Sequence, residues 1–93
     1  MDATEQLLKE LTEAPGLPGY EGEARAVMRR ALEGTAAEIT QDGLGSLIAT
    51  LPGSAERPRI MLAGHLDEVG FIVRFITENG FIRFLPLGGW WDQ

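Results

Sequence analysis

Apolar residues recur at helical spacing in the first third of the chain, where they mark two helices. One face of the second helix collects five of them at positions i, i+3, i+4, i+7 and i+8: Ala24, Val27, Met28, Ala31 and Leu32. This pattern predicts a helix over roughly residues 21–33. An earlier helix is expected to begin at Asp2, whose side chain can cap it while Glu5 returns the hydrogen bond. The breakers Pro15-Gly16 should end that first helix.

After the helices the pattern changes to that of strands. Residues 38–41 and 46–51 flank the turn-forming run Asp42-Gly43-Leu44-Gly45 and predict a hairpin. Residues 59–64 are apolar on both faces, as expected of a central strand that is covered on both sides. Two helices followed by a buried strand favour an α/β sheet.

A second hairpin is expected near the end of the chain. Residues 71–77 and 81–85 flank Glu78-Asn79-Gly80, and Asn-Gly is a strong signal for a hairpin turn. Both faces of this hairpin are apolar, which indicates the start of a β-rich unit. Trp90 and Trp91 stand next to the last residues with nothing after them to cover their rings, so the chain is expected to be cut from a longer one.

Composition narrows the class of protein. The chain has 93 residues, 44% of them hydrophobic and 24% charged, which suits one compact domain or parts of two and argues against disorder. The net charge of −6 disfavours nucleic acid and anionic membranes as partners. Cysteine is absent, which excludes disulfides and thiolate zinc sites. An acidic, polar start and no long apolar run predict a cytoplasmic protein without a membrane span.

The candidate chemistry lies at the end of the apolar segment, in Leu62-Ala63-Gly64-His65-Leu66-Asp67-Glu68. Strand geometry would put His65 and Asp67 on one face, where imidazole can bind zinc or cobalt and the carboxylate can orient the ring. On the residues alone other roles stay open. His65 can be a hydrogen-bonded structural residue, Asp67 can cap a turn, and Glu68 can be an outer ligand partner or a solvated turn residue.

Several blocks, in order along the chain, resemble the tetrahedral aminopeptidase family, which includes glutamyl and deblocking aminopeptidases and some proteins labelled cellulases or endoglucanases. The strongest block is the segment 60–71 around His65. The others resemble the family's helix–loop–helix, its first hairpin and the start of its inserted β domain: residues 14–21, 42–49, 80–84 and 88–90.

The resemblance implies a dinuclear metallopeptidase that acts on the amino termini of short peptides, uses two divalent ions, zinc or cobalt, and assembles as a homo-oligomer, in this family a dodecamer. It implies an α/β sandwich whose amino-terminal part is residues 1–70, followed by the start of an inserted β-rich, PDZ-like domain at 71–93. His65 would be a metal ligand, and Asp67, the candidate catalytic residue, would orient it. The remaining ligands and the general base would lie beyond position 93, so this chain is expected to be incomplete and inactive.

Two other functions remain as alternatives. The chain can be a non-catalytic remnant or an oligomerisation module of the same fold. A glycoside hydrolase would follow only from the cellulase label, and such enzymes use paired carboxyl groups rather than a histidine-bound metal. The residues around His65 therefore favour a peptidase over a glycosidase.

Overall fold

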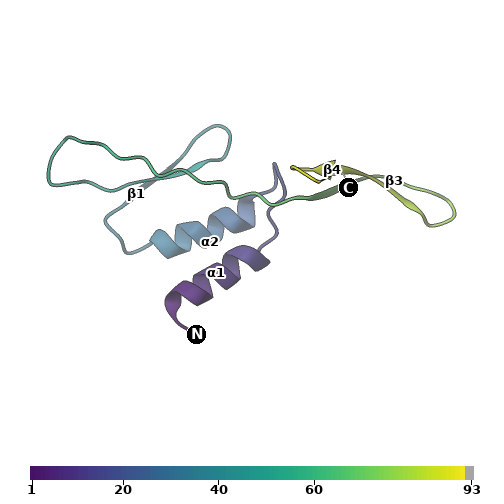
Figure 1. Ribbon diagram of the computed structural model, residues 1–93, viewed down its shortest axis with the longest axis horizontal. Helices are drawn as coiled ribbons and strands as arrows, with labels where there is room; N and C mark the ends of the chain where they lie inside the picture. The colour runs from purple at the N-terminus through teal and green to yellow at the C-terminus, as the bar shows by residue number, and fades with distance from the viewer. Residues whose placement is uncertain (92–93) are drawn as a thin grey trace.

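The computed structural model describes residues 1–91 and shows two helices, two hairpins and a long connecting segment (Figure 1). The elements, in chain order, are α1 (Ala3–Glu13), α2 (Gly22–Leu32), β1 (Glu38–Gln41), β2 (Leu47–Thr50), β3 (Gly70–Ile76) and β4 (Ile82–Leu87). The chain therefore mixes helices and strands, as predicted. Asp92 and Gln93, the last residues of the expected β-rich unit, lie outside the described residues. Over residues 1–91, no helix has the length and apolar character that a membrane crossing requires.

Helix α1 begins at the predicted capping box. Oδ1 of Asp2 accepts a hydrogen bond from the Glu5 N–H, and Oε2 of Glu5 accepts one from the Asp2 N–H, each at 2.9 Å. These two bonds satisfy donors that would otherwise be free at the helix start. After Glu13, Ala14 is extended and Pro15 cannot continue the helix, so the predicted end is also confirmed.

Helix α2 carries the small core of the molecule. Ala24 and Val27 are the buried hydrophobic side chains among residues 1–91, with 2% and 6% of their surface exposed. The helix packs against α1 on one side and lies close to β2 on the other (Figure 1). The predicted helix and its inward face are confirmed, but the face is only partly covered: Met28 and Leu32 are half-buried, and Ala31 is exposed.

Both hairpins are antiparallel, and the loop of each contains a glycine with positive φ. Gly45 has a φ of 90° and donates its N–H to the Asp42 carbonyl at 3.2 Å. Gly80 has a φ of 83° and donates to the Thr77 carbonyl at 3.0 Å. Glycine takes this conformation at little cost, which is why both predicted turns form where the sequence places them. Arg25 of α2 donates from Nη1 to the Gly45 carbonyl at 2.8 Å and ties the first loop to the helix.

The predicted central strand at 59–64 is wrong. Residues 51–69 form no helix or strand, and Leu62 is 94% exposed. The one backbone-to-backbone hydrogen bond described for this segment runs from the Glu68 N–H to the Gly16 carbonyl at 2.7 Å. A strand is stabilised when neighbours take up its lateral N–H and C=O groups, and neither hairpin pairs with this segment. Residues 60–63 are apolar, but no strand among the described residues pairs with them.

The molecule is elongated and open. It measures 63 × 32 × 26 Å, with the two hairpins toward opposite ends (Figure 1). Its radius of gyration is 17.8 Å, against about 12 Å for a compact domain of this length. Its accessible surface is 8228 Å², against about 5,300 Å² for a globular protein of this mass. Most of the exposed large apolar side chains lie on the extended segment and on the second hairpin.

We expect the 93-residue chain to self-associate, because exposed apolar surface and unpaired strand edges favour contact between copies. Light scattering coupled to size exclusion should give a mass above 10.1 kDa that rises with concentration. Ile82→Lys, which puts a charge on the exposed apolar surface of β4, should lower the association. A constant monomer mass over the whole concentration range would contradict this expectation.

Asp42 stabilises the first hairpin loop. Its Oδ1 accepts hydrogen bonds from the Ser46 N–H at 2.8 Å and the Leu44 N–H at 3.0 Å. The hydrogen bonds from Ser46 are the largest cause that lowers the pKa of Asp42 below its ordinary value, because they favour the charged form.

Asp42→Ala should therefore speed amide exchange in residues 38–50, while Asp42→Asn, which keeps an acceptor oxygen, should have a smaller effect. The folded pKa lies below the unfolded one, so the charged carboxylate contributes fully above the unfolded pKa. That contribution disappears as the pH falls through the folded pKa. Hydrogen exchange read by mass spectrometry, with each variant compared with the parent at each pH, should show the difference shrinking toward acid. An equal difference at all pH values would contradict the assignment.

Candidate functional site

His65 and Asp67 lie at the end of the extended segment, just before β3 begins at Gly70. Nδ1 of His65 lies 3.0 Å from Oδ1 of Asp67 and 2.9 Å from the Asp67 backbone carbonyl. A carbonyl oxygen can only accept, so Nδ1 has to carry the hydrogen in this contact. The side chain and main chain of Asp67 together hold the ring and select one tautomer.

That tautomer leaves Nε2 of His65 with a free lone pair on a side chain that is 85% exposed. A neutral imidazole nitrogen of this kind is the donor that zinc or cobalt takes from histidine, and the opposite nitrogen then needs an acceptor to hold the ring. The pair therefore fits one position in a metal coordination shell. No group of three His, Cys, Asp or Glu side chains suited to a metal ion occurs within residues 1–91. The described residues can supply one ligand but not a complete site.

Glu68 contributes through its main chain. Its N–H donates to the Gly16 carbonyl, while its side chain points into an exposed environment. Gly16 is itself buried, and a Cβ added there would lie 3.4 Å from the Leu66 carbonyl oxygen and 3.6 Å from the Ala24 Cβ. The loop between α1 and α2 thus fits between the first turn of α2 and the segment that carries His65.

The other flank of the site is held by Trp90. Its Nε1 donates to the carbonyls of Gly70 and Leu87, each at 3.1 Å. Its ring stacks on Phe71 with centroids 4.7 Å apart, and Phe71 meets Phe84 edge-on at 4.5 Å. These three rings pack together at the base of the second hairpin.

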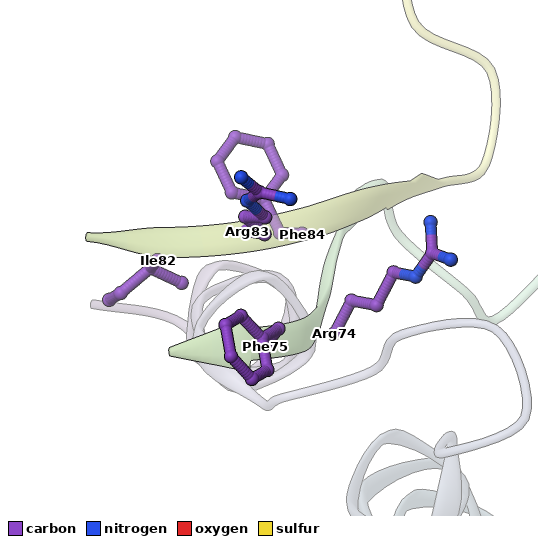
Figure 2. Close-up of a pocket in the computed structure, with 5 residues that line it drawn as sticks. All are labelled: Arg74, Phe75, Ile82, Arg83 and Phe84. Atoms are coloured by element: carbon purple, nitrogen blue, oxygen red, sulfur yellow. The ribbon is translucent and has the colours of Figure 1, made fainter. Parts of the chain in front are cut away.

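A surface depression lies elsewhere, on the hairpin of β3 and β4. Figure 2 shows the five side chains around it, drawn from both strands: Arg74, Phe75, Ile82, Arg83 and Phe84. None of them is a carboxylate or an imidazole, and the depression does not include His65. The residues around this depression therefore supply none of the carboxylate or imidazole groups that a hydrolytic site uses.

Sequence patterns did not reveal the residues that position the site. Leu17 and Gly70 touch, since a Cβ added to Gly70 would overlap Cδ2 of Leu17. The available signal was weak: a single leucine in a loop otherwise rich in Pro and Gly. Nothing in local periodicity connects that leucine with a glycine more than fifty residues later.

Comparison with protein families gives two matches. The model of the M42 glutamyl aminopeptidases matches residues 45–93, which include His65, Asp67 and the second hairpin. A second model, described as AMPT, matches residues 2–28, which hold α1 and most of α2.

Individual relatives agree with these matches. FrvX of Escherichia coli is 46% identical over 88 residues, which are 95% of this chain and 24% of that protein. The lysyl aminopeptidase of Pyrococcus furiosus is 39% identical over 85 residues, 90% of this chain and 24% of that protein. The crystal structure of a TET aminopeptidase from the marine sediment archaeon Thaumarchaeota archaeon SCGC AB-539-E09 is 46% identical and superposes with a TM-score of 0.89, covering 97% of this chain and 25% of that one. The chain thus spans about a quarter of the length of the relatives it matches.

Proposed function

This chain belongs to the M42 glutamyl aminopeptidase family, and on that premise we propose that it is the amino-terminal part of a metal-dependent aminopeptidase that acts on short peptides in the cytoplasm. The family match and the relatives named as aminopeptidases support the activity. The observation that carries the metal part of the proposal is the His65 ring, which is held at Nδ1 by Asp67 and is open at Nε2.

In this proposal the whole enzyme holds two divalent ions, zinc or cobalt, and His65 supplies one ligand through Nε2. A bound divalent ion polarises the peptide carbonyl and lowers the pKa of a bound water. The contribution of this chain is positional. Asp67 keeps the hydrogen on Nδ1 and holds the ring, which leaves Nε2 available to the ion. The other ligands and the general base are proposed to lie outside the described residues.

The proposal divides the chain near Gly70. Residues 1–70 belong to the catalytic α/β domain, and residues 71–93 begin an inserted β-rich, PDZ-like domain. The change from an extended segment to a hairpin at Gly70 supports a boundary there. The proposed assembly is a homo-oligomer, a dodecamer, in which further chain and neighbouring subunits cover the apolar surface that is exposed here.

A non-catalytic role for the 93-residue chain itself, as a remnant or an oligomerisation module of the same fold, is favoured by one observation. The sequence has a single histidine, and within residues 1–91 no cluster of ligands surrounds it. The two functions are compatible if the chain is inactive alone and forms part of the enzyme when it is continued.

For the 93-residue chain alone we expect negligible hydrolysis of aminoacyl-nitroanilides, even with added cobalt. One imidazole cannot hold the pair of ions that the chemistry requires. A chromogenic assay with the parent and His65→Ala side by side is the measurement. Turnover by the parent that His65→Ala abolishes would contradict the expectation.

In the full-length protein that contains this chain, Asp67→Ala should weaken metal binding about 10–100-fold, because it removes an acceptor that holds the ring. Asp67→Asn, which keeps an acceptor oxygen, should have a smaller effect, and His65→Ala a larger one. Titration of the metal-free protein with cobalt, followed by visible absorption, is the measurement.

Glu56→Ala is the matched control, since it removes an exposed carboxylate that lies earlier in the chain than His65 and Asp67. Unchanged cobalt binding in His65→Ala would sink the assignment of this ligand. Equal losses in Asp67→Ala and Glu56→Ala would remove the orienting role of Asp67.

A further inference from the structure

Gly70 lies where three parts of the chain meet. Its carbonyl accepts the Trp90 Nε1 hydrogen bond, and its α-carbon faces the Leu17 side chain of the α1–α2 loop. A Cβ at Gly70 would overlap Cδ2 of Leu17 and lie 3.2 Å from Cγ. The φ of Gly70 is not positive, so backbone freedom is not the reason for glycine here. The reason is space, because the leucine occupies the volume that a side chain would need.

The same loop also holds the segment by a hydrogen bond. The Gly16 carbonyl accepts the Glu68 N–H at 2.7 Å, which fixes the main chain immediately after Asp67. Two adjacent loop residues thus hold the segment at two points, residues 68 and 70. Figure 1 shows this loop crossing the extended segment beside the start of α2.

The attachment at residues 68 and 70 matters because no backbone hydrogen bond holds the preceding part of the segment in the described structure. Residues 51–67 donate and accept no backbone-to-backbone hydrogen bond in the described structure. Within this chain, the position of the His65 imidazole therefore depends on what holds residues 68–70, five residues or fewer away. The loop that does so lies between Pro15 and Pro18, and its Gly16 packs against Ala24 of α2. Proline restricts the backbone on each side of Leu17 and gives the loop a defined shape.

We propose that Leu17 is a positioning residue for the metal ligand His65, acting through its contact with Gly70. The proposal rests on the proposed function, in which His65 binds a divalent ion. The Leu17 side chain fixes how close the backbone at Gly70 lies to the loop. The hydrogen bond between Gly16 and Glu68 fixes the main chain just after Asp67, and Asp67 then orients the imidazole of His65. A larger residue at position 70 displaces the segment from the loop and carries His65 away from the other ligands of its ion.

The test uses the full-length protein in its metal-free form and four variants: Gly70→Ala, Leu17→Ala, the double variant that combines them, and Gly43→Ala. Gly43 is the matched control because a Cβ there meets nothing within 4 Å and its φ is not positive. Each protein is titrated with cobalt, and the absorption change that His65→Ala removes is assigned to the His65 ion. The thermal midpoint of each metal-free protein is measured in parallel.

Gly70→Ala is expected to weaken cobalt binding at the His65 ion about tenfold or more, the range found when supports of metal ligands are altered. The double variant should bind cobalt about as well as Leu17→Ala alone and better than Gly70→Ala, since Leu17→Ala removes the atoms that the new Cβ meets. Gly43→Ala should bind cobalt like the parent. If Gly70→Ala does not fold, Leu17→Ala carries the test, and it should weaken cobalt binding while the protein remains folded.

Three results would overturn the proposal. Normal cobalt affinity in Gly70→Ala or in a folded Leu17→Ala would show that the contact does not position His65. A lower thermal midpoint of Leu17→Ala with unchanged cobalt affinity would show that Leu17 contributes to stability but does not position His65. A double variant no better than Gly70→Ala would exclude the steric route. Failure of the proposed function is distinguishable, because then His65→Ala itself would leave cobalt binding intact.

Discussion

The contact between the α1–α2 loop and residues 68–70 is the interaction on which the candidate site depends. It joins the amino-terminal helices to a segment that no sheet neighbour holds in the described structure, through one hydrogen bond from Glu68 to Gly16 and one side-chain contact from Leu17 to Gly70. Trp90 holds Gly70 from the hairpin side. Without these contacts nothing in the described structure would fix the position of the imidazole. A metal ligand needs a fixed position.

The open shape of the molecule follows from a general constraint on extended backbone. The lateral N–H and C=O groups of a strand are satisfied only by neighbours, and an apolar strand stays dry only under a covering layer. Residues 59–64 have neither in this chain. The relatives are about four times as long, which agrees with a sheet whose other strands come from further chain. The proposed function accounts for both the excess apolar surface and the single imidazole, because in that proposal both belong to a larger arrangement.

Predictions from local signals succeeded for specific reasons. The capping box at Asp2 and Glu5 and the glycine-ended turns at Gly45 and Gly80 involve groups within four residues of one another. The contact between His65 and Asp67 is equally local, because a single residue, Leu66, separates the partners. The prediction of a buried strand at 59–64 failed, because burial depends on which other parts of the chain lie beside the segment. The contact of Leu17 with Gly70 was not foreseen at all.

The sequence by itself determined the two helices, the two hairpins and the pairing of an imidazole with a carboxylate, together with a family resemblance that the comparisons bear out. These features follow from short-range sterics and hydrogen bonds, which adjacent residues specify. The tertiary structure alone decided which surface is covered, where the His65 segment is attached and why position 70 is a glycine. Those outcomes depend on residues that are distant in the chain and meet only when it folds, so no local pattern encodes them.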